Sequence, residues 1–288
     1  MSVEPAMKLS PEVLKNWEEI ISSPSYRLAE LDTAFLQRPE LRPVRLQLEL
    51  LKPEMALAQE RVVSTIVLFG GTQIVERQVA ELRLQRARKE LAENKTSIPL
   101  ARAVARAERI LAKSKYYDAA REFARLVTTT CQVNRECEYV IATGGGPGIM
   151  EAGNRGAFEA GGKSIGLNIT LAEEQRPNPY ITPKLCFQFH YFALRKTHFV
   201  MRSKALVCFP GGFGTLDELF DALTLRQTRR MQEIPIILFG KEYWDEVIDF
   251  KFLADEGVIA DQHLELVRYA DTPEEAWHII SRFHGHAV

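Results

Sequence analysis

Short runs of apolar residues recur from residue 65 onward, and most are separated by stretches with the spacing of an amphipathic helix. The runs cover residues 65–69, 139–143, 164–168, 186–189, 205–209, 235–239 and, more weakly, 266–269. Strands that are apolar along their whole length are typical of a parallel sheet covered by helices on both faces. The pattern predicts an α/β fold with a doubly wound, mostly parallel sheet of about six to seven strands.

Two parts of the chain do not follow this rhythm. Residues 1–60 have helical patterns broken by prolines and no strand-like run, so we expect an N-terminal helical lead-in there and the α/β domain at 61–288. About 70 residues separate the first two apolar runs, which is too long for one crossover helix. We therefore predict a helical insertion at about 76–115.

The insertion and the residues that follow it are rich in basic side chains. Residues 76–125 hold thirteen Lys and Arg against seven Asp and Glu. One interpretation is a basic arm for nucleic acid. The other is a helical hairpin whose charges face water or a second subunit. The interspersed acidic residues favour the hairpin, and aromatic side chains do not alternate with the basic ones, so we do not expect a nucleic-acid partner.

The composition of the whole chain changes this picture little. The net charge is −1 and the pI is near 6.6, so no global charge favours nucleic acid or a membrane surface. No apolar run approaches the ~20 residues that span a bilayer, and we expect a cytoplasmic protein with no membrane partner. The four cysteines lack CxxC spacing and are interpreted as reduced thiols, with no metal site.

Glycine loops follow two of the apolar runs. Residues 144–148 read GGGPG and residues 210–214 read PGGFG, and each loop leads into a helical pattern. Neither loop fits the dinucleotide fingerprint GxGxxG, and Gly162-Lys163-Ser164 precedes a strand, unlike a P-loop. Two helix N-termini at one sheet edge suit the phosphate of a mononucleotide. The alternative is that both loops are only tight turns.

One acidic and one basic residue accompany the second loop. Glu218 lies in the first turn of the predicted helix, where it could act on a sugar held beside the phosphate. Alternatively, residues 215–218 form a capping box, in which Thr215 caps the helix and Glu218 returns to the cap. In either case, a helix N-terminus is expected to favour the ionised carboxylate. Arg195 lies on the preceding helical stretch and is either a ligand-binding residue or a surface arginine.

Together these elements resemble the LOG ("lonely guy") family, whose members are often labelled lysine decarboxylases. The family pattern PGGxGTxxE is matched by residues 210–218 and its Arg-Lys pair by Arg195 and Lys196. Its upstream GGGxxGxM is resembled by residues 144–150, which read GGGPGIM and are one position shorter. The resemblance covers roughly residues 61–288 and implies a Rossmann-like fold. Phe192 and Phe199 stand where the family often has methionine, and both are expected to line the base pocket.

The resemblance implies hydrolysis of the N-glycosidic bond of a nucleoside 5′-monophosphate to free base and ribose 5-phosphate. Glu218 would engage the ribose and position water, while Arg195 would bind the nucleotide and assist departure of the base. The phosphate and substrate would be held by residues of the two loops and the Arg-Lys pair, namely Gly211, Gly212, Gly214, Thr215, Gly145, Gly146, Gly148 and Lys196. No cofactor and no metal are expected.

The same resemblance leaves other functions open. Relatives of this fold include molybdenum-cofactor carriers and DprA-type single-stranded DNA binders, so a nucleotide or cofactor carrier without turnover is the alternative to the hydrolase. Arg195 and Glu218 at the family spacing favour the enzyme. Lysine decarboxylation is not expected, because no lysine has a recognisable context for a pyridoxal phosphate Schiff base. Family members build the site near a two-fold interface, and we therefore expect a homo-oligomer.

Overall fold

The computed structural model describes residues 9–132, 137–170 and 176–285 of the 288-residue chain. The chain divides into two compact units, Met1–Glu49 and Leu50–Val288. In the described chain no helix is both long and apolar enough to cross a membrane.

The first unit consists of short helices. Helix α1 (Pro11–Ser22) begins after Ser10, whose side chain accepts a hydrogen bond from the Val13 amide, and proline at its first position suits a helix start. It is followed by η1 (Pro24–Tyr26), η2 (Ala29–Leu31), α2 (Thr33–Leu36), η3 (Pro39–Leu41) and the start of α3 (Arg42–Gln59). No residue of α1 is buried.

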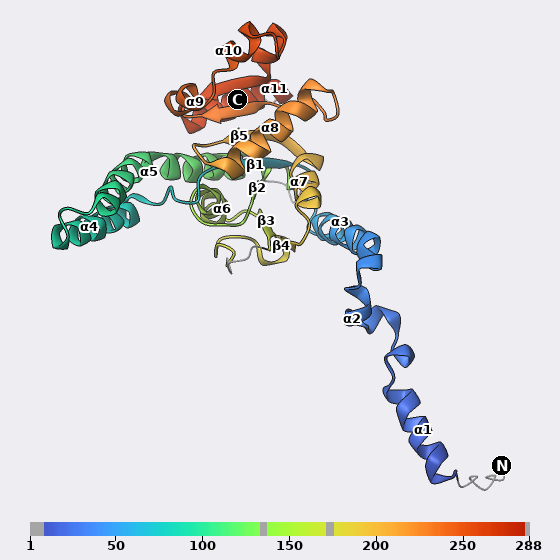
Figure 1. The fold of residues 1–288 in the computed structure, drawn as a ribbon. Coiled ribbons are helices and arrows are strands. Elements are labelled where there is room, and N and C mark those ends of the chain that lie inside the picture. Colours follow the sequence, from blue (N-terminus) through green and yellow to red (C-terminus); the bar gives the residue numbers. More distant parts are fainter. Residues whose placement is uncertain (1–8, 133–136, 171–175, 286–288) are drawn as a thin grey trace. The chain divides into compact units, whose positions relative to one another are not determined.

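The second unit is built on a seven-stranded sheet in the order β4-β3-β2-β1-β5-β6-β7, with every neighbouring pair parallel (Figure 1). The strands are β1 (Thr65–Phe69), β2 (Val140–Thr143), β3 (Ser164–Ile169), β4 (Cys186–Phe189), β5 (Ser203–Cys208), β6 (Ile236–Phe239) and β7 (Val267–Ala270). The predicted parallel α/β fold is therefore confirmed, and the weak run at 266–269 is the seventh strand.

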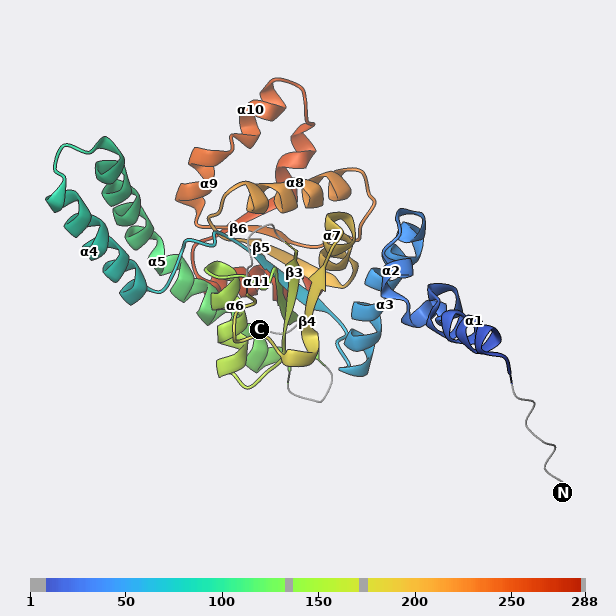
Figure 2. The same cartoon turned by 60° about the horizontal axis from the view of Figure 1, so that its bottom comes forward.

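Helices cover both faces of this sheet (Figure 2). Alternate strand residues point to opposite faces: Ile66 and Leu68 join one buried cluster, and Val67 and Phe69 join the other. The first cluster includes residues of α5 (Ile98–Cys131), α6 (Ile149–Glu159) and α11 (Pro273–His284); the second includes residues of α3, α7 (Phe192–Met201), α8 (Phe213–Gln227) and α9 (Lys241–Val247). The remaining helices are η4 (Pro183–Leu185), α10 (Phe250–Asp255) and η5 (Asp261–Leu266).

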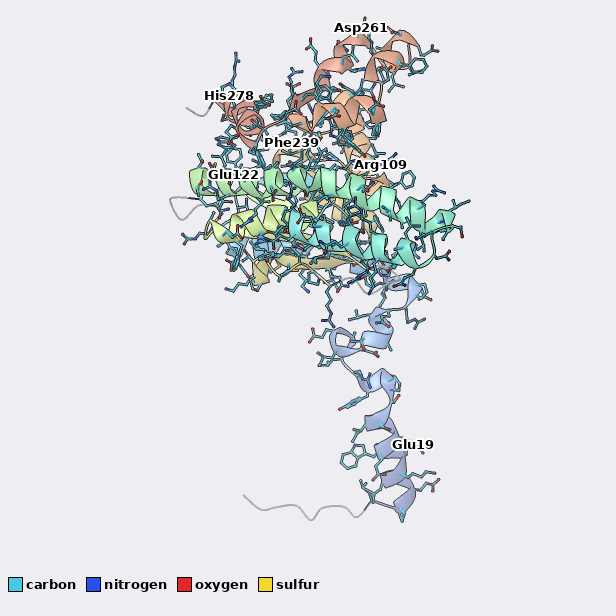
Figure 3. All side chains as sticks on the ribbon, turned by 90° about the vertical axis from the view of Figure 1, so that its left-hand side faces the viewer. Glu19, Arg109, Glu122, Phe239, Asp261 and His278 are labelled. Atoms are coloured by element: carbon cyan, nitrogen blue, oxygen red, sulfur yellow. The ribbon has the colours of Figure 1, made fainter. Side chains whose placement is uncertain are left out.

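The long connection between β1 and β2 forms a helical hairpin. Helix α4 (Arg77–Glu93) runs against the first half of α5, and Figure 3 shows Arg109 on that half and Glu122 on the half that covers the sheet. Only Ala80 and Leu84 of α4 are buried. The hairpin therefore presents mostly charged side chains to solvent.

An ionic network holds the inner half of α5 against α6. Arg121 donates two hydrogen bonds to Glu159 at 2.6 and 2.7 Å, and Arg155 binds both Glu159 at 2.9 Å and Glu76 at 3.1 Å. The Tyr117 hydroxyl donates to Glu151 at 2.9 Å. These contacts fix the helix that begins at the first glycine loop.

The α5–α6 contact provides a test of this packing. A Cβ at Gly156 would lie 2.0 Å from the Arg121 carbonyl oxygen, so the two helix backbones can approach only where a side chain is missing. We expect Gly156→Ala to lower the free energy of unfolding by about 3 kcal/mol through overpacking, measured by urea denaturation. Gly214→Ala is the control, because a Cβ there meets nothing within 4 Å. Equal stability of the two variants would contradict this account.

Candidate active site

The order in which the chain adds strands to the sheet reverses between β1 and β5, although the two strands are parallel. These strands are neighbours, yet β1 is followed in the chain by β2 on one side, whereas β5 is followed by β6 on the other. The loops that leave their carboxyl ends therefore separate and open a crevice. Such switch points are where open parallel sheets bind ligands.

A cavity of 320 Å³ lies in this crevice. Its walls come from the loops after β1, β2 and β5 and from α7 and α8: Phe69, Gly70, Gly71, Thr72, Gly144, Met150, Phe192, Arg195, Gly212, Phe213, Gly214, Thr215, Asp217 and Glu218. The structure thus brings together Glu218, Arg195, Gly212, Gly214 and Thr215 of the expected site residues.

The N-terminus of α8 faces this cavity and offers backbone donors. The amides of Thr215 and Leu216 both donate to the Gly212 carbonyl, whereas those of Phe213 and Gly214 have no acceptor among the described residues. A Cβ on Gly212 or Gly214 would meet no atom within 4 Å, so protein packing does not use this space. An open helix N-terminus with free amides is suited to an anion.

Helix α8 begins at Phe213, and its N-cap is Gly212, which has no side chain to contribute. Thr215 is therefore the third helical residue, and its hydroxyl folds back against Gly211. Glu218 lies in the second turn. The capping-box interpretation of residues 215–218 is wrong, because the helix starts before Thr215 and Glu218 cannot return to its first turn.

The Glu218 carboxyl is buried, with the residue only 8% exposed. Burial raises its pKa from 4.5 to about 7, against the opposing effect of Lys196 and Arg195, while Asp217 and Asp221 add to the rise. None of the described residues hydrogen-bonds this carboxyl. The expectation of a firmly ionised carboxylate is therefore wrong, since desolvation outweighs the helix N-terminus and the two cations.

Arg195 reaches the cavity from α7 and is held on three sides. Its Nε donates to the Leu167 carbonyl at 2.7 Å, and its guanidinium carbon lies 5.2 Å from the centre of the Phe199 ring. A Cβ on Gly144 would lie 2.5 Å from its Nη2, so this glycine leaves room for the guanidinium. Burial lowers the pKa of Arg195 and Glu218 raises it. The surface-arginine interpretation is wrong.

Other expected site residues do not line the cavity. Lys196 is not among the lining residues and binds Asp217 at 2.9 Å and Asp221 at 3.6 Å, which makes it a partner of two α8 carboxylates. Gly211 also does not line the cavity, and its carbonyl accepts a hydrogen bond from the Tyr243 hydroxyl at 2.6 Å. These two residues support the site without reaching the cavity.

The glycines after β2 shape their own loop. Gly145 and Gly148 have φ of 74° and 73°, a backbone region that favours glycine, and a Cβ on Gly148 would lie 2.4 Å from the Gly71 carbonyl. The Gly146 carbonyl accepts from Asn178 at 3.1 Å. Of this run only Gly144 lines the cavity. The lack of a side chain at Gly148 therefore lets the loop after β2 approach the loop after β1.

Several residues of the site were not expected from the sequence. Residues 70–72 form a third wall, for which the glycines ending the first apolar run were an available signal. Asp217 and the exposed Phe213 also line the cavity. Phe192 lines it as expected, but Phe199 does not: it is buried and packs edge-on against Phe69 at 4.9 Å.

The described residues contain no cluster of three or more His, Cys, Asp or Glu side chains that could hold a metal ion. The groups of the cavity that suit an anion are instead backbone amides and one guanidinium.

Comparison with known proteins assigns the chain to a family. Residues 150–280 match the family model described as "Possible lysine decarboxylase". The chain is also 26% identical over 167 residues to the cytokinin riboside 5′-monophosphate phosphoribohydrolase LOG3 of Arabidopsis thaliana, covering 57% of this chain and 73% of the relative. The chain belongs to the LOG family. The expected resemblance is confirmed.

Two solved structures are also similar to this LOG family chain. A molybdenum cofactor binding protein from the phototrophic bacterium Rippkaea orientalis is 22% identical, with a TM-score of 0.42, over 58% of this chain and 87% of that chain. The protein TM1055 is 21% identical, with a TM-score of 0.46, over 76% of this chain and 99% of that chain.

The raised pKa of Glu218 predicts how stability depends on pH. The folded protein binds this proton more tightly than the unfolded chain, so stability is lost as pH rises from 4.5 to about 7. Glu218→Gln removes this loss of stability, because glutamine has no proton to release. We expect the variant to be more stable than the parent by on the order of 2–3 kcal/mol at pH 8 and by much less at pH 5, measured by urea unfolding.

Glu246→Gln is the matched control, since Glu246 is exposed and on the same side of the sheet. It should show no such pH dependence. A Glu218→Gln effect that is the same at pH 5 and pH 8 would show that the carboxyl titrates normally.

Proposed function

We propose that this cavity hydrolyses the N-glycosidic bond of a nucleoside 5′-monophosphate, releasing the free base and ribose 5-phosphate. The observation that carries the proposal is the buried Glu218 carboxyl, with a pKa of about 7, beside the open N-terminus of α8 and the Arg195 guanidinium. A carboxyl that titrates near neutrality can exchange a proton with a reacting water at physiological pH.

The N-terminus of α8 would hold the 5′-phosphate. The amides of Phe213 and Gly214 and the helix dipole supply the attraction, and the missing Cβ atoms at Gly212 and Gly214 leave room for the phosphate oxygens. A nucleotide held in this way would have its ribose toward Glu218, which lies in the second turn of α8. The acidic side chain would then face the sugar and not the phosphate.

Glu218 and Arg195 would act at the two ends of the bond that breaks. As the C1′–N bond lengthens, positive charge builds on the sugar, and the Glu218 carboxylate stabilises it. Water would form the new C1′–O bond and give a proton to Glu218, while the base departs with the bond's electron pair. Glu218 would then release this proton to solvent as the base takes one up from solvent, so that the carboxylate is restored. Arg195 would bind the nucleotide and stabilise negative charge on the departing base.

The walls of the cavity suit an aromatic base. Phe192 is half exposed at its rim, and Phe213 is 92% exposed between the two open glycines. Exposed rings of this kind can stack on any base, so the geometry supports a nucleotide without selecting one. Lysine decarboxylation has no such support, because no lysine lies among the described residues of the cavity.

The reaction can be tested by incubating the purified protein with a panel of nucleoside 5′-monophosphates and measuring ribose 5-phosphate. We expect release from at least one of them. Glu218→Gln should lower the rate by about 10²–10⁴-fold while nucleotide binding is retained. In the parent protein, kcat/KM should rise with pH through an apparent pKa near 7, as the carboxylate forms.

Folded protein that binds a nucleotide but releases no ribose 5-phosphate from any of the panel would contradict the hydrolase and favour a carrier. Glu246→Gln serves again as the control and should keep the parental rate, since Glu246 does not line the cavity.

Gly144 offers a test of how Arg195 is positioned. An alanine Cβ would overlap the Arg195 guanidinium and lie 2.8 Å from the Met150 sulfur, so the flexible side chains must move. We expect Gly144→Ala to lower kcat by about 10²-fold with a smaller change in stability. A parental kcat in this variant would show that the position of Arg195 does not matter for the reaction.

A further inference from the structure

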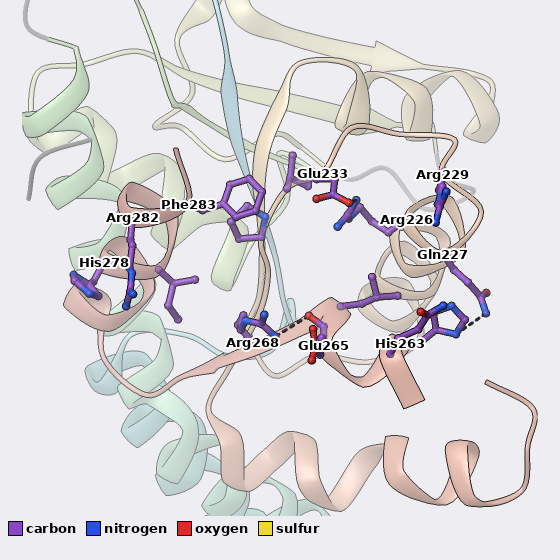
Figure 4. A pocket seen from close by; sticks show the side chains of 15 residues that line it. Arg226, Gln227, Arg229, Glu233, His263, Glu265, Arg268, His278, Arg282 and Phe283 are labelled. Carbon is purple, nitrogen blue, oxygen red and sulfur yellow. Dashed lines mark hydrogen bonds and ion pairs between the residues drawn. The ribbon is translucent and has the colours of Figure 1, made fainter. Parts of the chain in front are cut away.

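A second and larger cavity lies at the opposite edge of the sheet. Its volume is 760 Å³, and its walls come from the end of α8, the segment before β6, η5, the start of β7 and α11 (Figure 4). The loops of the candidate active site follow the carboxyl ends of the strands, whereas this cavity lies at the amino ends of β6 and β7. It is therefore separate from the candidate active site.

Guanidinium groups dominate the polar lining of this cavity. Four arginines line it, Arg226, Arg229, Arg268 and Arg282, together with His263 and His278, against the two carboxylates of Glu233 and Glu265. Figure 4 shows Arg226 and Arg229 on one side, Arg282 and His278 on the other, and Arg268 between them. The cavity therefore carries an excess of positive charge on two facing walls.

Among the described residues, most of these arginines have no carboxylate partner. Arg226 is paired only loosely with Glu233, at 3.5 Å, and its buried Nε has no hydrogen-bond acceptor. Arg268 donates to the carbonyls of Glu265 and Val267, and no carboxylate binds it within the described chain. Within the described chain, no carboxylate binds Arg229 or Arg282 either. Unpaired cations gathered in one cavity repel one another unless an anion joins them.

The backbone holds Arg229 in place at a conformational cost. Helix α8 ends in a Schellman motif, in which the amide of Arg230 donates to the Leu225 carbonyl and that of Arg229 to the Arg226 carbonyl. The left-handed residue of this motif is usually glycine, but here it is Arg229, with φ of 56°. An arginine therefore stands at a position whose backbone conformation favours glycine, which has no side chain.

The size and walls of the cavity define the anion. A volume of 760 Å³ is that of a small-molecule site. A single phosphate would fill only a small part of this volume. A linear anion of two or more phosphates fills more of it and offers oxygens to arginines on both sides, and arginine binds phosphate oxygens in a bidentate manner. Apolar walls from Ile279 and the half-exposed Phe283 leave room for an attached ring.

We propose that this cavity binds a polyphosphate chain, held between Arg226 and Arg229 at the end of α8 and Arg282 of α11, with Arg268 lying between the two sides. The ligand is either inorganic polyphosphate or a nucleoside polyphosphate, which share this chemistry. Helix α8 has its first residue at the candidate active site and its last at this cavity, so the two ligands would occupy opposite ends of one helix.

Calorimetric titration of the full chain at 0.15 M salt tests the proposal, with sodium tripolyphosphate, adenosine triphosphate and orthophosphate as probes. We expect tripolyphosphate or the triphosphate nucleotide to bind at least tenfold more tightly than orthophosphate. Tighter binding of the nucleotide would identify a nucleoside polyphosphate as the ligand, and tighter binding of tripolyphosphate the inorganic chain.

The double variant Arg229→Glu/Arg282→Glu should weaken this binding at least tenfold. Both side chains are exposed and unpaired in the described chain, so the variant should fold, and Arg229→Gln/Arg282→Gln provides a milder test. Arg230→Glu is the matched control: Arg230 is the next residue, exposed, and outside the cavity.

Three results would overturn the proposal. The first is an absence of polyphosphate binding by the parent protein. The second is an equal loss of affinity in Arg230→Glu, which would mean attraction to the general surface charge. The third is parental affinity in both double variants, which would place the ligand elsewhere, including at the N-terminus of α8.

Discussion

The candidate site depends on the burial of one carboxyl, that of Glu218, between β1 and β5, where the strand order of the sheet reverses. Glu218 is carried into the crevice by the second turn of α8, whose start is fixed by the end of β5. There, desolvation outweighs two nearby cations and raises the pKa to about 7. The same crevice holds the open amides at the start of α8, which lie in the turn before Glu218.

Close backbone approach makes this crevice narrow enough to bury the carboxyl. Gly70 packs against Ile149, Gly148 against the Gly71 carbonyl and Gly144 against the Arg195 guanidinium, each at a distance that leaves no room for a Cβ. Gly212 and Gly214 are different, because nothing in the protein fills the space beside them. Some glycines thus serve the packing of three loops, and the others leave space for a ligand.

Much of the fold could be predicted from the sequence, because strands buried on both faces leave continuous apolar runs, and all seven were found within one or two residues of their ends. The start of α8 could not. Thr215 and Glu218 fit a capping box by residue type, but the glycines before Thr215 are equally able to begin a helix, and packing decided between them. The pKa of Glu218 was misjudged for a related reason. Helix position can be seen in a sequence, whereas the burial that outweighs it depends on residues 70–72 and 144, which only the sheet brings near.

The most direct test of this account is the titration of Glu218 itself. Carboxyl carbons of ¹³C-labelled glutamate can be followed by NMR from pH 3 to pH 9 in the parent protein and in Glu218→Gln. The account predicts one resonance with a midpoint near pH 7 that is missing from the variant. If every glutamate of the parent titrates close to its ordinary pKa, the carboxyl is not desolvated in the folded protein, and the central claim is wrong.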